Sequence, residues 1–247
     1  MPATGFRQPL PQPLMPRRAF LEGTAALGAV AVAAAFSGTA LAQATAAPVF
    51  IPPGSDGVRQ LLVHAIRAAV SQLGMPDGFW NSRVARCGIP VLFAKTRANA
   101  AGPLGQDEFR RQLQHRINTL AEAAIRGAAP TLEAGASKLT LADPVAVIRG
   151  VPTAATTQLR AEMKSDLVNA MIATLEPILT TTPDPVMTQA VAAVGALGPI
   201  SNRDVAHAIS LVAENGAWYQ IGAAEVAIRK NPAAIGDPVL TAAFGTI

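Results

Sequence analysis

Residues 56–73 read DGVRQLLVHAIRAAVSQL, and this stretch decides the fold class. Its apolar side chains recur at steps of three and four and so share one helix face: Val58, Leu61, Leu62, Ala65, Ile66, Ala69, Val70 and Leu73. Asp56 is placed to cap the start of the helix, and Gly74 with Pro76 ends it. The stretch therefore predicts an amphipathic helix with one buried face.

The same spacing continues toward the C-terminus, whereas the alternation typical of strands is rare. We predict further helices near 90–102, 106–128, 131–137, 145–148, 153–179, 186–197 and 202–230, and a last short segment that ends with Phe244 and Gly245. Pro130 suits the first turn of the helix at 131–137. Pro177 is expected to kink or end the helix at 153–179.

Short polar motifs mark where these helices start and where the chain bends. Thr140 with Asp143, and Ser201 with Asp204, have the spacing of capping boxes. The run TTTPDP at 180–185 is the strongest internal break and predicts a hinge. Since the loops are short and no internal repeat is present, we expect an all-α chain: a compact multi-helix orthogonal bundle, forming a single domain at 56–247 after an N-terminal signal peptide.

The N-terminal stretch has the three parts of an export signal. PRRAFL at 16–21 is followed by a weakly hydrophobic Ala/Gly-rich run and then by small residues, with no charge between residues 23 and 55. It resembles the twin-arginine (Tat) signals, whose core is Ser/Thr-Arg-Arg-x-Phe-Leu-Lys, and the matching residues are Arg17, Arg18, Phe20 and Leu21. Pro16 and Glu22 depart from that core.

This resemblance implies a division of the chain and a location. Residues 1–42 are the expected signal peptide, with cleavage after Ala42 or Ala44, and 43–55 are a flexible mature N-terminus. The implied partners are the Tat translocase and signal peptidase, and the implied location is the periplasm. The two alternatives are a general secretory signal and an uncleaved membrane anchor. The weak hydrophobicity of the apolar run disfavours both, because secretory signals are usually more hydrophobic and a membrane span needs about 20 consistently apolar residues.

Composition limits what the mature chain can do. Removal of residues 1–42 leaves 17 basic and 15 acidic groups without a Lys/Arg block, so we expect no nucleic-acid partner and no membrane span. Cys87 is the single cysteine, which excludes an intramolecular disulfide, and we expect its thiol to be buried. His64, His115 and His207 are far apart and show no metal-ligand spacing, so we expect no metal, no cofactor and no catalytic constellation.

Three polar pairs are the first candidate site. Each pair is spaced one helical turn apart, so its two members share a helix face: Asn118 with Glu122, Thr156 with Arg160, and Glu225 with Arg229. If the pairs meet in space, they form a pocket suited to a small carboxylate or a sugar. The alternative, which we favour, is that they hold the helices in register through buried polar contacts.

The loop at 77–81, DGFWN, is the second candidate. The aromatic rings of Phe79 and Trp80 are placed to contact a ligand or partner, and Asp77 with Gly78 favours a turn. The structural alternative, again the one we favour, is that the aromatic rings plug one end of the bundle.

Several motifs occur together in a fixed order along nearly all of the mature chain. They are GVRQLL at 57–62, DGFWN at 77–81, IP at 89–90, INTLAE at 117–122, LTLAD at 139–143, IRG at 148–150, AAT at 154–156, EPI at 176–178, NGAW at 215–218 and AEVAIRKNP at 224–232. The set resembles a family of bacterial exported proteins, domain of unknown function 4197. The chain departs from the family at Gln158 and Leu159, where a Tyr-Phe pair is usual, and at Ala224, where an acidic residue is usual.

The resemblance implies the helical fold and the exported location, and it leaves the function open. We expect a non-enzymatic periplasmic protein that binds a partner or serves the cell envelope. The alternative is a small-molecule binder or hydrolase, which requires the three polar pairs to converge on a solvent-reachable cavity.

Overall fold

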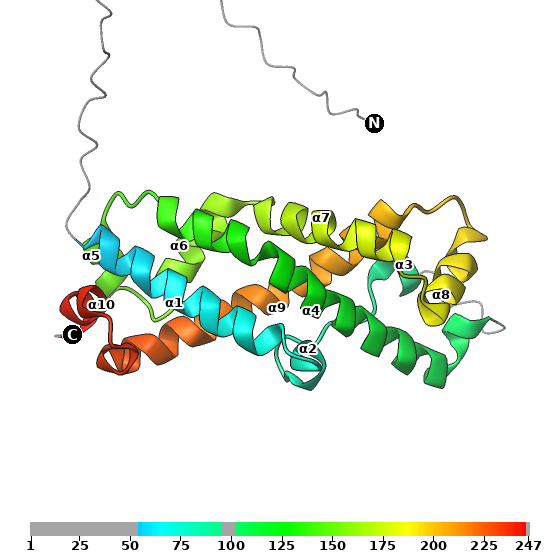
Figure 1. Ribbon diagram of the computed structural model, residues 1–247, viewed down its shortest axis with the longest axis horizontal. Coiled ribbons are helices and arrows are strands. Elements are labelled where there is room, and N and C mark those ends of the chain that lie inside the picture. Colours follow the sequence, from blue (N-terminus) through cyan, green and yellow to red (C-terminus); the bar gives the residue numbers. More distant parts are fainter. Residues whose placement is uncertain (1–53, 95–101, 246–247) are drawn as a thin grey trace, which may run out of the picture. The chain divides into compact units, whose positions relative to one another are not determined.

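A computed structural model of the chain describes residues 54–94 and 102–245. The predicted export signal at 1–42, with Arg17 and Arg18, lies outside the described residues, as does most of the predicted N-terminal segment at 43–55. Every regular element in the described part is a helix, as the apolar spacing predicted (Figure 1). The helices are α1 (Ser55–Leu73), α2 (Gly78–Asn81), α3 (Val91–Ala94), η1 (Pro103–Gly105), α4 (Asp107–Lys138), α5 (Pro144–Arg149), α6 (Ala154–Met163), α7 (Asp166–Thr181), α8 (Pro185–Gly195), α9 (Asn202–Lys230), η2 (Pro232–Ile235) and α10 (Pro238–Phe244).

Four long helices supply most of the core. α4 and α9 cross each other, and α1 and α7 each contact both of them. The apolar stripes of these helices meet between them, where Ile66, Ile117, Leu175 and Ile221 are fully buried. Burial of such stripes stabilises helices that would be marginal alone. The compact helical bundle that the sequence predicted is therefore confirmed.

The ends of the bundle are closed by the shorter elements. α10 packs on α1, α6 packs on α9, and α8 contacts α4. Asp184, which belongs to the segment 180–185, caps α8 by accepting the Met187 N–H at 2.8 Å. The hinge expected in that turn stays a prediction. None of the helices in the described residues is both long and apolar enough to span a membrane.

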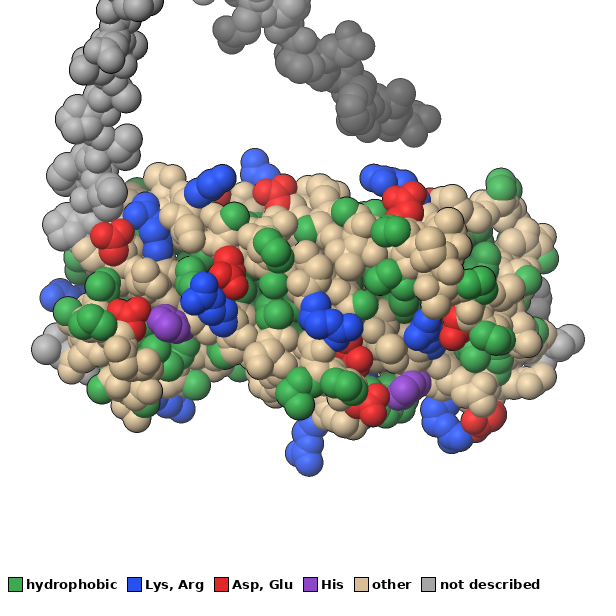
Figure 2. Space-filling model, in the orientation of Figure 1, with side chains coloured by type: hydrophobic (Ala, Val, Ile, Leu, Met, Phe, Trp, Pro, Cys, Tyr) green, Lys and Arg blue, Asp and Glu red, His purple; other side chains and the backbone are tan. Residues whose placement is uncertain are grey.

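Charged side chains are spread over the face drawn in Figure 2 rather than gathered. Figure 2 shows Lys and Arg side chains interspersed with Asp and Glu across one face of the molecule. Several are paired, as with Arg67 and Glu133 at 2.8 Å. Exposed pairs of this kind contribute about 0–1 kcal/mol each, so the apolar core carries the stability of the fold.

Two prolines lie inside helices, although Pro130 was predicted to begin a separate helix and Pro177 to kink or end one. Pro130 lies inside α4, which runs without interruption across the boundary predicted at 128–131, and Pro177 lies inside α7. Both prolines lie on exposed positions of their helices, where the lost backbone hydrogen bond costs less than it would in the core. Fully buried neighbours, Ala128 and Leu132, hold α4 against the core on either side of Pro130.

A break that carries no Gly or Pro divides the predicted helix 153–179. α6 ends at Met163 and α7 begins at Asp166, because Lys164 adopts a left-handed φ of 48°. Met163 and Leu167 are both buried on the two sides of the break. The change of direction lets α6 pack on α9 while α7 packs on both α4 and α9.

Helix caps were predicted with mixed success. Ser201 and Asp204 form the expected capping box, and α9 has the predicted bounds. At α5 the cap is Asp143, which accepts the Ala146 N–H at 2.9 Å, so the capping box predicted from Thr140 is wrong. α1 begins after Gly54 instead of at Asp56, which lies in the first turn and pairs with Arg59.

Candidate functional site

Glu225, from the third predicted pair, is the most heavily hydrogen-bonded carboxylate of the candidate residues. It lies on α9, is fully buried, and accepts the backbone N–H groups of Ala155 at 3.1 Å and Thr156 at 2.8 Å. The Thr156 hydroxyl donates to it at 2.6 Å, and Arg229 Nε donates at 2.9 Å. The N-cap residue of α6, Thr153, makes no capping bond of its own. Glu225 therefore caps α6 from a different helix.

Arg229 completes this arrangement at the neighbouring helix end. It donates to the carbonyls of Ile148 at 2.8 Å and Val147 at 3.0 Å, near the C-terminus of α5. Its guanidinium carbon lies 4.8 Å from the ring centroid of Phe244 on α10. Glu225 and Arg229 thus join four helices, and the bonds of the Glu225 carboxylate leave it unavailable to a ligand.

Asn118, from the first pair, holds the loop that contains Cys87. Its Oδ1 accepts the Cys87 N–H at 2.8 Å, and its Nδ2 donates to the Cys87 carbonyl at 3.0 Å. Cys87 is buried, as expected, and burial together with the Glu122 charge raises the pKa of its thiol to about 12. The thiol is therefore protonated and unsuited to nucleophilic attack at neutral pH.

Glu122 is the partner of Asn118 in sequence but not in space. Its side chain is buried, and its Oε1 has no hydrogen-bond partner in the described residues. Burial, and next the charge of Asp77, raise the pKa of this carboxyl, while Arg126, His115 and the Phe79 backbone oppose the shift. The ionised form of Glu122 is thus less favourable in the folded protein than in water.

The six residues do not form one site. Thr156, Glu225 and Arg229 meet, whereas Asn118 and Glu122 lie around Cys87. Arg160 turns to another part of α9 and donates to Asn215 Oδ1 at 2.8 Å. Thr156 and Arg160 also line an open groove with the exposed Tyr219. The single polar pocket considered from the sequence is therefore not formed.

The loop at 77–81 forms α2 and packs against α4. Phe79 is fully buried, and Trp80 is half-buried with its ring centroid 5.0 Å from that of His115, edge to face. Asp77 adopts a left-handed φ of 59°, and its Oδ1 lies 2.9 Å from His115 Nε2. Phe79 is thus part of the core, while Trp80 stays within reach of solvent, and the plug at one end of the bundle stays a prediction.

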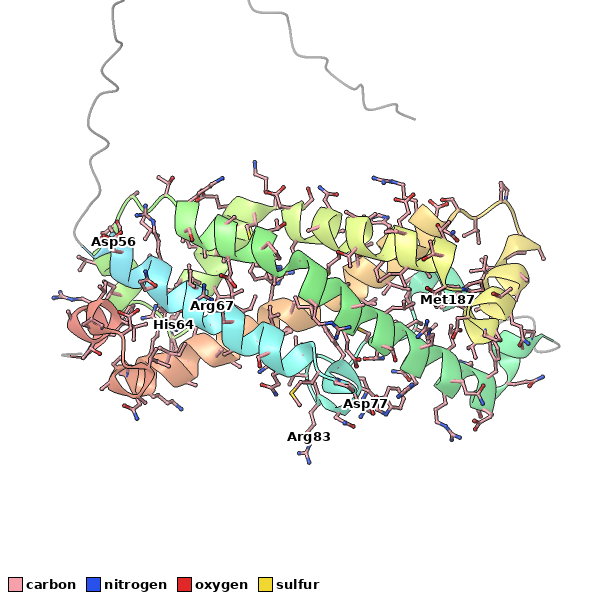
Figure 3. All side chains as sticks on the ribbon, in the orientation of Figure 1. Asp56, His64, Arg67, Asp77, Arg83 and Met187 are labelled. Atoms are coloured by element: carbon pink, nitrogen blue, oxygen red, sulfur yellow. The ribbon has the colours of Figure 1, made fainter. Side chains whose placement is uncertain are left out.

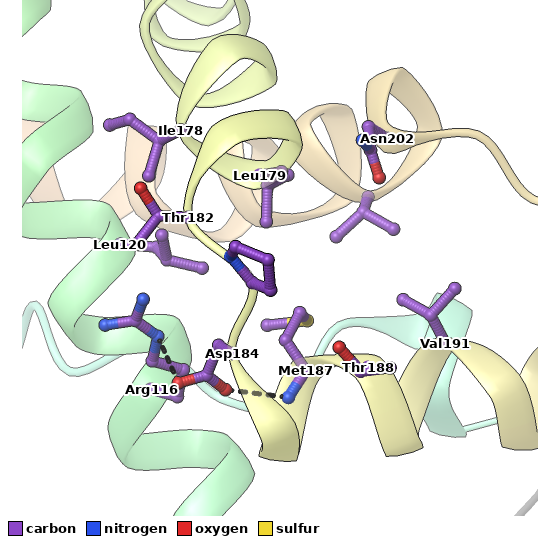
Figure 4. A pocket seen from close by; sticks show the side chains of 12 residues that line it. Arg116, Leu120, Ile178, Leu179, Thr182, Asp184, Met187, Thr188, Val191 and Asn202 are labelled. Atoms are coloured by element: carbon purple, nitrogen blue, oxygen red, sulfur yellow. Dashed lines mark hydrogen bonds and ion pairs between the residues drawn. The ribbon is translucent and has the colours of Figure 1, made fainter.

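A pocket that the sequence did not indicate lies where α4, the α7–α8 turn, α8 and α9 meet (Figure 4). We call it the Arg116 pocket, and its volume is about 220 Å³. Its apolar lining residues are Leu120, Ile178, Leu179, Pro183, Met187, Val191 and Val205. Its polar lining residues are Arg116, Thr182, Asp184, Thr188 and Asn202. The lining comes from positions far apart in the sequence, so no local motif could have revealed it.

Arg116 and Asp184 form the charged side of this pocket. Arg116 Nε lies 3.1 Å from Asp184 Oδ2, with the two side chains 26% and 24% exposed. The Nε atom is itself buried, and its N–H makes no hydrogen bond within the described residues despite the short distance. Arg116 and Asp184 also line a second, more open hollow of about 530 Å³, together with Trp80 and His115. Trp80 of the candidate loop therefore lines a hollow that neighbours the Arg116 pocket, because Arg116 and Asp184 line both.

Two kinds of side-chain grouping bear on catalysis in the described residues: metal-ligand clusters and histidine–carboxylate contacts. In residues 54–94 and 102–245, no group of three or more His, Cys, Asp or Glu side chains is arranged to hold a metal ion. The two histidine–carboxylate contacts, His64 with Asp237 and His115 with Asp77, have no Ser, Thr or Cys side chain hydrogen-bonded to the imidazole in the described part of the chain. A nucleophile with an adjacent base is the usual sign of covalent catalysis.

Comparison with known proteins identifies a family and no individual relative. No curated protein and no solved structure matches the chain. The family described as "Protein of unknown function (DUF4197)" matches residues 54–245, which is most of the chain and nearly all of its described helices. The chain therefore belongs to the DUF4197 family, as its ordered motifs predicted.

Proposed function

We propose that the protein is exported through the twin-arginine pathway and acts in the periplasm as a non-enzymatic binding protein. The sequence at 16–21 supports export. A lone buried cysteine is also compatible with that route, because a domain without disulfides can fold before it crosses the membrane. The export signal serves as an address, and the binding role rests on the domain that follows it.

The Arg116 pocket is the observation that supports binding best. It combines an apolar wall with one charged side, which is the usual make-up of a small-molecule site. A cavity of about 150 Å³ with apolar walls is large enough to hold benzene, so a pocket of about 220 Å³ has room for a small organic ligand. The small-molecule alternative is thus supported at this pocket instead of at the three polar pairs.

Export is tested by fractionation of a bacterial host that has an intact twin-arginine translocase. The full chain should be recovered in processed form from the periplasm, and the paired change Arg17→Lys with Arg18→Lys should leave the precursor in the cytoplasm. A matched control, Arg7→Lys, lies outside the motif and should export normally. Unchanged export of the paired variant would contradict the proposed route.

Binding is tested with benzene as a neutral probe of the pocket. In NMR spectra of the purified protein, benzene should shift the signals of Leu120, Met187 and Val191. Val191→Phe should abolish these shifts by filling the pocket, whereas Leu197→Phe, at a side chain that is 61% exposed, should not. Shifts that are absent, or that are equal in both variants, would count against a binding pocket here.

A further inference from the structure

The Arg116 pocket has two unlike sides. Figure 4 shows Arg116 and Asp184 on one side, and Val191 on the other beyond the apolar side chains, with the uncharged polar residues Thr188 and Asn202 on that same side. A ligand that fits both sides has a short apolar body and one polar end. This inference rests on the proposed function, because it names the ligand class of the same pocket.

On the charged side the Arg116 guanidinium is incompletely hydrogen-bonded, while Thr182, Thr188 and Asn202 add uncharged polar groups to the lining. No hydrogen bond from the Arg116 guanidinium is found among the described residues, although its Nε lies 3.1 Å from Asp184 Oδ2. Asp184 is engaged already, because its Oδ1 accepts the Met187 N–H at 2.8 Å at the N-terminus of α8. Unpaired N–H donors on a partly buried guanidinium are matched by an oxyanion, and a carboxylate fits their planar fork.

We infer that the ligand of the Arg116 pocket is a small monocarboxylate with a compact apolar body. Its carboxylate accepts hydrogen bonds from the Arg116 guanidinium, and its hydrocarbon part lies against Leu120, Met187 and Val191. The volume of about 220 Å³ limits the body to a short chain or one ring. The ion pair to Asp184 holds the Arg116 guanidinium beside the pocket that both residues line.

Three probes of equal chain length test the charge of the ligand on the unchanged protein. Dissociation constants are measured by NMR titration of the purified full chain with hexanoate, hexan-1-ol and hexylamine. Hexanoate should bind at least about tenfold more tightly than hexan-1-ol, because a charge-assisted bond replaces an unmade one. Tighter binding of hexylamine would assign the polar side to Asp184 and overturn the inference.

Substitution of the guanidinium gives the second test. Arg116→Gln should weaken hexanoate at least about tenfold and leave benzene binding unchanged. Arg83→Gln is the control, because Arg83 is exposed and projects away from the helices near α2 in Figure 3. Equal affinities for hexanoate and hexan-1-ol would overturn the carboxylate inference alone if benzene still binds. Loss of benzene binding as well would remove the proposed function itself.

Discussion

Glu225 on α9 accepts the Thr156 backbone N–H at 2.8 Å, and so the first turn of α6 is capped by a side chain that lies 69 residues further along the chain. A cap supplied across such a separation can form only after α6 and α9 pack together. The cap of α6 therefore depends on tertiary structure. Its loss should destabilise both the first turn of α6 and the packing of α6 on α9.

Removal of this carboxylate should be strongly destabilising. Glu225→Ala leaves the Ala155 and Thr156 N–H groups uncapped and Arg229 with a buried, unpaired Nε, so we expect a loss of about 3 kcal/mol in the free energy of unfolding. Urea denaturation measures it. Glu162→Gln, at an exposed position of α6, should change stability by less than about 0.5 kcal/mol. Equal effects of the two variants would show that the cap contributes nothing.

The burial of Glu122 predicts a distinct pH dependence. Because the folded state raises the pKa of this carboxyl above its usual value of 4.5, its contribution to stability is complete below that value and is lost as the pH rises through the folded pKa. Glu122→Gln should remove this loss and make the protein more stable than the wild type at pH 8 by on the order of 1 kcal/mol. At pH 4 the difference between the two proteins should shrink. Stability curves that run parallel from pH 4 to pH 8 would contradict the assignment.

Cys87 should react slowly with thiol reagents in the folded protein. Its thiol is buried with a pKa of about 12, and Asn118 holds both the N–H and the carbonyl of the residue. Asn118→Ala should release the loop and speed labelling at least about tenfold, the equivalent of about 1.4 kcal/mol of local stability. Thr119→Ala, one position along α4, is the control. Rapid labelling of the wild-type protein would mean that the loop opens freely.

Gly216 lies where α9 passes close to the chain at Ala85. A Cβ at this position would lie 2.7 Å from the Ala85 carbonyl oxygen and 2.9 Å from Ala85 Cα. Gly216→Ala should therefore destabilise the protein by about 1–3 kcal/mol, despite the higher helix propensity of alanine. Gly195→Ala at the end of α8 meets nothing within 4 Å and should be neutral or slightly stabilising. A thermal unfolding midpoint for Gly216→Ala that matches Gly195→Ala would contradict the close approach.

The sequence predicted the helices best where local signals agreed with packing. The bounds of α9 follow from the Ser201 capping box at one end and Asn231-Pro232 at the other. Pro130 misled, because a proline on an exposed helix face costs less than one in the core. The break at Lys164 has no local signal, since it arises from the different packing of α6 and α7.

The candidate site was harder to predict, because side-chain partners are chosen by tertiary structure. The spacing of four residues correctly predicted that Glu225 and Arg229 pair, with Arg229 Nη2 2.8 Å from Glu225 Oε1. The same spacing failed for Thr156 and Arg160, which take partners on α9 instead of facing one another. No local pattern in the sequence marks Arg116 as a site residue, since its role in the pocket depends on an ion pair with Asp184, far along the chain.

The orientation of hexanoate in the Arg116 pocket tests the central claim most directly. In intermolecular NOE spectra of the purified full chain, the terminal methyl group of hexanoate should show contacts with Met187 and Val191, and the methylene beside the carboxylate with Arg116. The reverse orientation, or contacts confined to another surface such as the groove at Tyr219, would contradict the account.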